Sequence, residues 1–403
     1  MLVRCSGRDR PGITTGLLGV LADSGAELFD MEQVVVRDRL TLDLAIGVED
    51  GDQALKNLLY HGWERGLQLD FEVLEGAAPR PGGTRNVVTV IGQVLTPAAL
   101  RDVTAAIAAT GANIDRIVRL SRYPVVSYEF VTLGGDLDRM RAELVAAAKQ
   151  HTVDVAVQRE SLERRAKRLV VMDVDSTLIQ DEVIELLARE GGCGAEVERI
   201  TARAMAGELD FEASLRERTA LLAGMSADVL DTVATKVRLT PGARTFVRTL
   251  KRLGYTVAIV SGGFTHVTDR LAADLGIDHA AANELEIVDG VLTGRLLGEV
   301  IDRAGKARVL REIAAAEQVP LEQTVAIGDG ANDLDMIATA GLGIAFNAKP
   351  VVREAADTAV SVPFLDAILF LLGIRREDIE QADAADPTMA DVEPVPVPGT
   401  PPA

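Results

Sequence analysis

Short runs of apolar residues recur through the second half of the chain, and a stretch with helical spacing follows each run. The runs lie at Leu169–Met172, Val257–Val260 and Val325–Ile327. Continuous β-branched and long apolar residues are typical of strands that are buried on both faces. Strands and helices alternate in this way from Leu169 to about Ile374, which predicts an α/β fold with a Rossmann-like, mostly parallel sheet and right-handed crossovers.

A different pattern occupies the chain before residue 160, where one order of strands and helices occurs twice. In the first copy the elements are Leu2–Gly7, the helix Ile13–Asp23, Met31–Arg37 and Leu40–Val48. In the second copy they are Val87–Ile91, a helix with Thr96 as its N-cap and Pro97 at its first position, Arg116–Leu120, Val125–Leu133, the helix Leu137–His151 and Thr152–Gln158. Each copy therefore predicts a βαββαβ unit.

Four connecting segments complete the pattern. From Asp181 to about Val237 the spacing is helical throughout, which predicts a helical cap inserted after the strand Leu169–Met172. The charged stretch Arg159–Arg168 is expected to be a helical linker whose charges face solvent. Val288–Val291 has the composition of a type I′ hairpin turn. Residues 387–403 are rich in proline and without periodicity, so a disordered tail is expected there.

The chain is strongly acidic, with 42 Lys and Arg residues against 61 Asp and Glu residues and a net charge of −19. A chain with this charge and few aromatic residues is a poor candidate for binding a phosphate backbone, so nucleic acid is not an expected partner. A small anionic substrate must instead be captured by local positive charge against the overall negative field.

The remaining composition favours a cytoplasmic protein. The two cysteines, Cys5 and Cys193, suit a reducing compartment better than a disulfide framework. No apolar run approaches the roughly 18 residues that a membrane span needs. Charged residues such as Arg4 and Arg8 interrupt the start of the chain, which therefore does not resemble a signal peptide.

Two aspartates, Asp173 and Asp175, directly follow the strand Leu169–Met172. Residues two apart in a strand point the same way, so we expect both carboxylates at the carboxyl end of the sheet, where α/β proteins bind ligands. Carboxylates this close repel each other unless a cation or a proton lies between them. Taken alone, the pair is compatible with a cation site or with an ordinary soluble loop.

Three further polar sites follow the same layout. Ser261-Gly262-Gly263 comes after the second of the apolar strands, and the segment Gly328–Asp333, which contains Asp329 and Asn332, comes after the third. Between them, Lys306 begins a helix. Together with the two aspartates, these sites resemble the four motifs of the haloacid dehalogenase-like phosphohydrolases.

This resemblance implies a role for each acid. Asp173 is the nucleophile that forms an aspartyl-phosphate, and Asp175 protonates the leaving oxygen and then activates water. Relatives that preserve the acyl-phosphate, such as the ion-pumping ATPases, lack an acid at the second place, so Asp175 indicates a phosphatase. The implied cofactor is Mg²⁺, with the side chains of Asp173 and Asp329 and the backbone carbonyl of Asp175 as ligands, and with Asp333 behind them.

The resemblance also implies how the phosphate is held. Ser261 and the amide of Gly262 bind it at a helix N-terminus, and Asn332 donates to it or orients a ligand. Lys306 neutralises the charge of the aspartate and the phosphate. Without the resemblance, Lys306 has a second interpretation as a surface lysine that extends into solvent.

The predicted cap contains two charged residues on apolar faces. Arg218 shares a helix face with Phe211, Leu215 and Leu222, and its planar guanidinium fits a carboxylate. Glu182 also turns inward by its spacing. The two residues either pair with each other or bracket a zwitterion, with Glu182 on an ammonium and Arg218 on a carboxylate.

Longer stretches are similar to the phosphoserine phosphatase family, over nearly all of residues 169–360. They include MDVDSTLIQDEVIELLA, FEASLRERTALLAG, SGGFT and GDGANDLDMIATAGLGIAFNAKP. The similarity implies hydrolysis of O-phospho-L-serine to L-serine and phosphate, the final step of serine biosynthesis. It also implies that Glu182 and Arg218 recognise the amino acid and that Met205 and Phe211 line the pocket.

The two N-terminal copies resemble ACT domains, which are ferredoxin-like modules that bind amino acids. The loop from Gly7 to Gly12 matches that family well and implies a regulatory ligand at Gly7, Asp9 and Gly12, whereas Gly92–Pro97 of the second copy lacks the charged residues. The resemblance implies feedback regulation by L-serine or another amino acid and a homodimer. A dimerisation module without a ligand is the alternative.

These patterns predict four parts of the chain: ACT domains at 1–80 and 85–160, a phosphatase core at 168–380 with its cap at about 181–237, and the tail at 387–403. Two other functions stay open. One is a phosphatase of another small phospho-metabolite. The other is an amino-acid-sensing regulatory protein whose catalytic domain has become a signalling partner.

Overall fold

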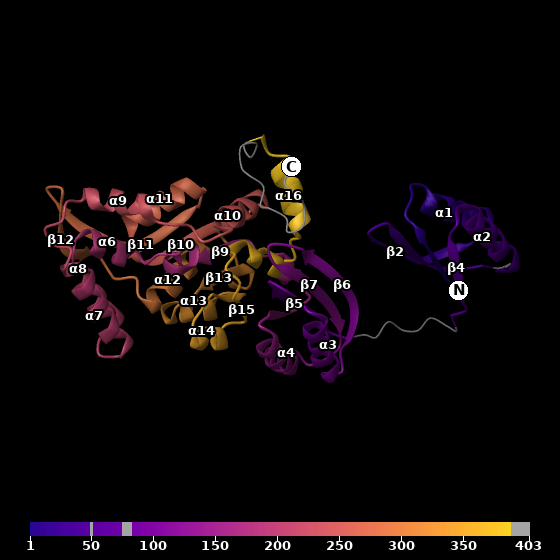
Figure 1. Ribbon diagram of the computed structural model, residues 1–403, viewed down its shortest axis with the longest axis horizontal. Coiled ribbons are helices and arrows are strands. Elements are labelled where there is room, and N and C mark those ends of the chain that lie inside the picture. Colours follow the sequence, from indigo (N-terminus) through magenta and orange to yellow (C-terminus); the bar gives the residue numbers. More distant parts are fainter. Residues whose placement is uncertain (49–50, 75–82, 388–403) are drawn as a thin grey trace. The chain divides into compact units, whose positions relative to one another are not determined.

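The computed structural model describes residues 1–48, 51–74 and 83–387, with the side chains at 51, 52 and 205 excepted. The chain divides into two compact units, Met1–Gly82 and Gly83–Ala403. Figure 1 shows the elements of each unit in sequence colours. The tail expected to be disordered falls on residues 388–403 apart from its first position, Pro387, and so lies outside the described residues.

The first unit is a four-stranded antiparallel sheet with two helices. Its elements are β1 (Leu2–Arg8), α1 (Ile13–Asp23), β2 (Glu27–Val36), β3 (Arg39–Gly47), α2 (Gly51–Arg65) and β4 (Gln68–Glu72), with strand order β2-β3-β1-β4. The core joins Val3 and Leu42 of the sheet to Leu17 and Leu58 of the helices. The predicted βαββαβ order is confirmed for this copy.

The second unit begins with the same order of elements. They are β5 (Arg85–Gly92), α3 (Pro97–Ala109), β6 (Asn113–Ser121), β7 (Val126–Leu133), α4 (Leu137–His151) and β8 (Asp154–Arg159), with strand order β6-β7-β5-β8. Thr96 caps α3 as expected, since its side chain accepts a hydrogen bond from Ala99 N at 3.2 Å. The helices α3 and α4 cover one face of this sheet.

The other face of this sheet packs on the α/β core that follows it. Ile91, Leu120, Val125 and Ala156 belong to the same buried cluster as the core of the larger sheet. Polar contacts join the two parts as well, for example from Ser361 N to Asp154 Oδ2 at 2.6 Å. The second βαββαβ unit is therefore built into the hydrophobic core of the following domain.

The linker prediction was wrong about two of its charges. The short helix α5 (Leu162–Arg165) lies in the stretch, but Arg164 is 8% exposed and its guanidinium is 2.6 Å from Glu129 Oε2. Lys167 is also buried, and its ammonium donates to the carbonyl oxygen of Glu322 at 2.5 Å. These two charges lie at contacts with other segments, which a run of polar residues does not reveal. The remaining arginines of the linker, Arg159, Arg165 and Arg168, are exposed as expected.

The large sheet has seven strands in the order β12-β11-β10-β9-β13-β14-β15. They are β9 (Leu169–Met172), β10 (Thr256–Phe264), β11 (His279–Val288), β12 (Val291–Leu297), β13 (Thr324–Gly328), β14 (Gly343–Phe346) and β15 (Thr358–Val360). Every pairing is parallel except the hairpin of β11 and β12, whose turn has positive φ at Asp289 (49°) and Gly290 (76°), as a type I′ turn requires. The fold class expected from the sequence is confirmed.

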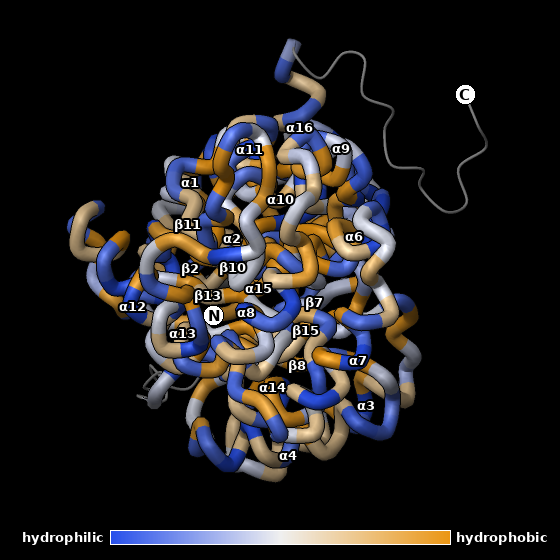
Figure 2. The backbone as a smooth tube through the Cα atoms, turned by 90° about the vertical axis from the view of Figure 1, so that its left-hand side faces the viewer, coloured by the Kyte–Doolittle hydropathy of each residue, from blue (hydrophilic) through white to orange (hydrophobic). Residues whose placement is uncertain are grey.

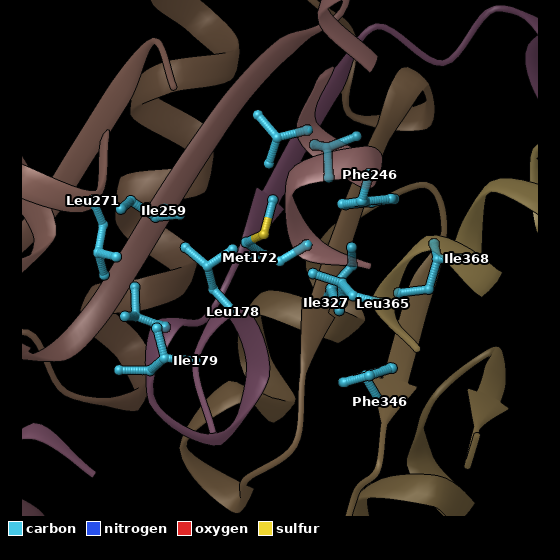
Figure 3. Packing of buried hydrophobic residues seen from close by; sticks show 14 of the residues in the cluster. Met172, Leu178, Ile179, Phe246, Ile259, Leu271, Ile327, Phe346, Leu365 and Ile368 are labelled. Carbon is cyan, nitrogen blue, oxygen red and sulfur yellow. The ribbon is translucent and has the colours of Figure 1, made fainter. Parts of the chain in front are cut away.

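Helices cover both faces of this sheet, and β9 shows why its apolar run is unbroken. Leu169 and Val171 face α12 (Arg303–Ala316) and α13 (Leu334–Thr339), whereas Val170 and Met172 face α10 (Ala243–Arg252) and α11 (Thr265–Leu275). Figure 3 shows Met172 beside residues of the adjacent strands and of α10, and Figure 2 shows the hydrophobic colour at β10 and β13. All four residues of β9 are fully buried.

Four helices lie between β9 and α10, in the segment where a cap was predicted. They are α6 (Val183–Glu190), α7 (Gly194–Met205), α8 (Phe211–Ala220) and α9 (Asp228–Lys236). The C-terminal part adds α14 (Pro350–Ala355), α15 (Ile368–Leu371) and α16 (Arg376–Ala384). Among the described residues, none of the helices combines the length and the apolar character that a membrane span requires.

Candidate active site

Asp173 lies at the carboxyl end of the central strand β9. Its backbone N–H still donates to Ile327 O of β13 at 2.9 Å, so the neighbouring strand holds it in place. The side chain is 3% exposed, and Asp173 Oδ1 accepts a hydrogen bond from Val174 N at 2.7 Å. After Asp173 the chain leaves the sheet in one irregular turn, Val174–Leu178, in which Ser176 has φ of 59°.

The structure corrects the reason given for the position of Asp175. The strand ends at Met172, so strand alternation does not place the two aspartates. Instead, the irregular turn directs Asp175 towards the next strand, where its Oδ2 accepts from Ser261 Oγ at 2.8 Å. Its Oδ1 accepts from Val183 N, also at 2.8 Å. Burial raises the pKa of Asp175, and these two hydrogen bonds oppose that rise.

Three aspartates from two loops meet below this turn. Asp173, Asp329 and Asp333 each offer a carboxylate oxygen, and these atoms lie within 4.8 Å of one another. Asp175 points elsewhere with its side chain. Hard oxygen donors in a buried cluster of this kind fit a cation such as Mg²⁺. Because of its negative charge, the cluster also needs a compensating cation to remain ionised.

Lys306 supplies part of that positive charge. Its ammonium lies 2.6 Å from Asp173 Oδ1 and 2.6 Å from Asp333 Oδ1, and the side chain is fully buried. Burial alone would lower the pKa of Lys306, but the two carboxylates outweigh it and raise the pKa. The interpretation of Lys306 as a lysine that extends into solvent was therefore wrong.

One positive charge does not compensate three carboxylates, and their pKa values reflect this. Burial and the charge of Asp333 raise the pKa of Asp173, although Lys306 opposes the rise. Burial and the charge of Asp333 likewise raise the pKa of Asp329, to about 6. A divalent cation would stabilise the ionised forms of both carboxylates and lower their pKa values. The residues of the site therefore fit such an ion.

Ser261–Gly263 form a loop-like bulge within β10, near its carboxyl end and beside Asp175. Pairing between β10 and β11 shifts between Val260 and Phe264, so the loop bulges out of the ladder. A Cβ atom on Gly262 would lie 2.8 Å from the ring of Phe211 of the cap. Glycine at this position therefore lets the cap approach the loop, and α11 begins just behind it at Thr265.

The remaining residues expected to contact phosphate or metal lie in the loop after β13. Asn332 is half-buried in the short turn Ala331–Asp333. Asp333 Oδ2 accepts from Gly330 N at 3.0 Å, so this acid shapes its own loop as well as contacting Lys306. No role had been predicted for Thr177, whose hydroxyl donates to Asp329 Oδ1 at 3.4 Å.

Glu182 and Arg218 face the same site from two cap segments without forming an ion pair with each other in the described structure. Glu182 Oε1 accepts from Ser176 Oγ at 2.8 Å. Arg218 Nε donates to Ser214 O at 3.3 Å. Although Glu182 has an exposed surface, desolvation of its carboxylate by the surrounding protein and the charges of Asp175 and Asp329 raise its pKa to about 7. Burial lowers the pKa of Arg218 despite the nearby acids.

Phe211 and Met205 were predicted to line the pocket, and the structure describes the side chain of the first only. Phe211 is partly buried at the start of α8 and lies against Gly262. Met205 ends α7, and its side chain lies outside what the structure describes. Sequence reasoning missed Asn283 of β11, which is 2% exposed and hydrogen-bonded to Gly262. An asparagine directly after the alanine run of a strand was the available signal.

In the first unit, Gly7 lies near the end of β1, and Asp9 and Gly12 lie on the connection from β1 to α1. Gly7 packs so closely on Leu67 that a Cβ atom would lie 2.6 Å from that side chain. Asp9 is exposed, and its backbone N–H donates to Asp38 O. Gly12 caps α1 with φ of 89°, a conformation that favours glycine.

Comparison with known families supports each part of this architecture. The haloacid dehalogenase-like hydrolase family matches residues 170–338. ACT domain families match residues 1–72 and 84–158. The chain is 57% identical to a phosphoserine phosphatase of Streptomyces coelicolor, over 97% of this chain and 95% of that protein. It is 47% identical to phosphoserine phosphatase SerB2 of Mycobacterium tuberculosis, over 98% of each.

Solved structures agree. A probable phosphoserine phosphatase from Vibrio cholerae, in its unliganded form, is 38% identical with a TM-score of 0.58, over 73% of this chain and 88% of that chain. A haloacid dehalogenase family hydrolase from Salmonella enterica is 30% identical with a TM-score of 0.64, over 72% and 98%. The chain therefore belongs to the phosphoserine phosphatase family of haloacid dehalogenase-like hydrolases and is a phosphoric monoester hydrolase with two ACT domains.

Proposed function

We propose that the enzyme hydrolyses O-phospho-L-serine to L-serine and phosphate through an aspartyl-phosphate on Asp173, as the final step of serine biosynthesis in the cytoplasm. The observation that carries the proposal is the buried arrangement of Asp173 with Lys306 and Asp333, beside an Asp175 carboxyl that is already hydrogen-bonded. The relatives named above, similar over nearly the whole chain, support the choice of substrate.

Each protein group has a place in this reaction. Asp173 attacks phosphorus while the ester oxygen departs, and the proton of Asp175 goes to that oxygen. Asp175 then takes a proton from the water that hydrolyses the acyl-phosphate. Lys306, at 2.6 Å from Asp173 Oδ1, stabilises the ionised nucleophile. Ser261 and Gly262 orient the phosphate.

Mg²⁺ is the proposed cofactor, held by Asp173, Asp329 and the Asp175 backbone carbonyl, with Asp333 adjoining. When bound, the ion would supply positive charge to the phosphate oxygens and lower the repulsion between the ester and the carboxylates. The carboxylate cluster within 4.8 Å supports this assignment.

Glu182 and Arg218 are proposed to recognise the two charged ends of the amino acid. Arg218 has one backbone hydrogen bond and no carboxylate partner in the described structure, so its guanidinium nitrogens Nη1 and Nη2 remain available. Glu182 is accessible at the same site and can accept from an ammonium. The pairing of these two residues with each other, which the sequence left open, is not seen.

A substrate panel tests this proposal directly. Phosphoserine should be preferred over phosphothreonine, glycerol phosphate and p-nitrophenyl phosphate. Arg218→Ala should lower kcat/KM for phosphoserine by about 100-fold, because a charged hydrogen-bonded partner is lost, while p-nitrophenyl phosphate hydrolysis should change less than threefold. Arg216→Ala on the exposed face of the same helix is the matched control. Equal losses on both substrates would mean that Arg218 is structural. A different preferred substrate would favour the alternative of another phospho-metabolite.

The ACT domains are proposed to bind L-serine or another amino acid and to support a homodimer. The edge strand β2 supports the second part, because all 10 of its residues are exposed and Phe29 is 64% exposed. Calorimetric titration of serine and light scattering of the intact protein test these two statements. An active protein that binds no amino acid would restrict the ACT pair to an assembly role.

A further inference from the structure

The loop that faces the phosphate site is held from outside the four motifs. Asn283 of β11 is 2% exposed, and its Nδ2 donates to Gly262 O at 2.9 Å. Its Oδ1 accepts from Ile301 N at 2.8 Å. A carbonyl at one end and an N–H at the other allow only one orientation of the side-chain amide.

The register of the sheet explains why this contact is needed. Asn283 pairs with Phe264 after the irregularity in β10, so the three residues Ser261–Gly263 leave the ladder. Backbone groups that leave a ladder in a buried place need other partners. The side chain of Asn283 provides one to the Gly262 carbonyl, so that the bulge is held without a strand pairing.

The hydrogen bond at Gly262 determines what the next amide does. Carbonyl and N–H of a trans peptide point in opposite directions, so fixing Gly262 O directs Gly263 N–H the other way. That N–H donates to Ser261 Oγ at 2.7 Å, and Ser261 Oγ donates to Asp175 Oδ2 at 2.8 Å. A continuous series of hydrogen bonds therefore runs from Asn283 to Asp175, and such series strengthen each member.

The other end of Asn283 reaches the helix that carries Lys306. Ile301 precedes Asp302, which caps α12 by accepting from Gly305 N at 2.7 Å. Lys306 follows in the next position. One buried amide thus links the strand end that carries the phosphate loop to the start of the helix that carries the buried lysine.

We propose that Asn283 is a positioning residue for the reaction: it fixes the Gly262–Gly263 peptide, and through Ser261 it holds the Asp175 carboxyl in place. The proposal rests on the proposed phosphatase reaction and extends it to a residue outside the motifs. Asn283 acts through other groups and does not touch the substrate.

The test compares Asn283→Ala and Asn283→Asp with the unaltered protein on phosphoserine and p-nitrophenyl phosphate. We expect kcat to fall about tenfold or more, with KM changed less than about threefold, because misplacement of reacting groups slows the chemical step more than it weakens binding. The matched controls are Asn86→Ala and Asn86→Asp, since Asn86 is 1% exposed and its Nδ2 donates to a carbonyl, Gly134 O, in the second ACT domain. They should lower the unfolding temperature with kcat unchanged.

A second comparison separates positioning from general stability. If Asn283 acts through Ser261, combining Asn283→Ala with Ser261→Ala should reduce kcat no further than Ser261→Ala alone. Losses that multiply, or a kcat for folded Asn283→Ala equal to that of the unaltered protein, would overturn the proposal.

A structural readout on the unaltered protein applies even where the variants do not fold. In crystals grown with inorganic phosphate, the Asn283 amide should remain within hydrogen-bonding distance of Gly262 O, and an amide turned away would overturn the proposal. If the unaltered protein hydrolyses neither ester, the proposed reaction is wrong. The crystal structure would still show whether the Asn283 amide holds the Gly262 carbonyl.

Discussion

Asp329 offers a test in which loss of function should accompany a gain in stability. Its carboxylate belongs to a cluster of three aspartates that shares a single lysine, Lys306. Burial, and secondly the charge of Asp333, raise its pKa from 3.8 to about 6. The carboxyl group is therefore easier to ionise in the unfolded chain than in the metal-free fold. Stability that neutral Asp329 contributes is complete below pH 4 and is lost as the pH rises through 6.

The Asp329→Asn substitution removes this charge at every pH and keeps an oxygen that can accept from Thr177. Since one pKa unit corresponds to about 1.4 kcal/mol, the upper limit of the gain at pH 7 is about 3 kcal/mol. Partial exposure of the side chain lets solvent screen the charge, so we expect about 2 kcal/mol. For a domain of this size that is a rise of about 4–8 °C in the melting temperature of the catalytic part.

Calorimetric unfolding in EDTA at pH 4 and at pH 7 measures this effect. The variant should match the unaltered protein at pH 4 and exceed it at pH 7, and Mg²⁺ should stabilise only the unaltered protein appreciably. Asp278→Asn is the control of opposite sign, because Lys251 and the Val257 amide outweigh partial burial and lower the pKa of Asp278. An Asp329→Asn variant that is less stable than the unaltered protein in EDTA at pH 7 would refute the reasoning.

Three other predictions concern catalysis, recognition and domain packing. Asp173→Asn should keep its unfolding transition but lose at least about 1,000-fold in kcat and form no acyl-phosphate, since the nucleophile is absent; normal turnover in this variant would exclude the covalent scheme. Because the pKa of Glu182 is raised to about 7, KM for phosphoserine should fall as the pH rises from 6 to 8, and Glu182→Gln should remove that part of the dependence; an identical KM profile in both proteins would argue against an ammonium contact. Arg376 Nη1 lies 2.6 Å from the buried Asp366, so Arg376→Met should destabilise the second unit by about 3–5 kcal/mol in urea unfolding. The additional change Asp366→Asn should restore part of that loss, and a double variant as unstable as Arg376→Met alone would contradict the pairing.

Two of the wrong expectations have a common physical origin. Strand alternation was used to bring Asp173 and Asp175 together, whereas the strand stops at Met172 and the irregular turn that follows directs the Asp175 side chain towards Ser261. The linker charges were assigned to solvent, whereas Arg164 lies in a domain junction. In both cases the decisive contact lies with a segment distant in the chain, which local spacing does not contain.

The sequence by itself determined the repeated βαββαβ units, the parallel α/β sheet and the identity of the acids, lysine and serine at the strand ends, because periodicity and motif spacing are local properties of the chain. Only the tertiary structure decided that Lys306 is buried between two carboxylates, that Ser261 donates to Asp175 and that Asn283 holds the Gly262 carbonyl. Those contacts depend on which strands are neighbours and where their pairing shifts. Sequence spacing carries no information on either until the chain is folded.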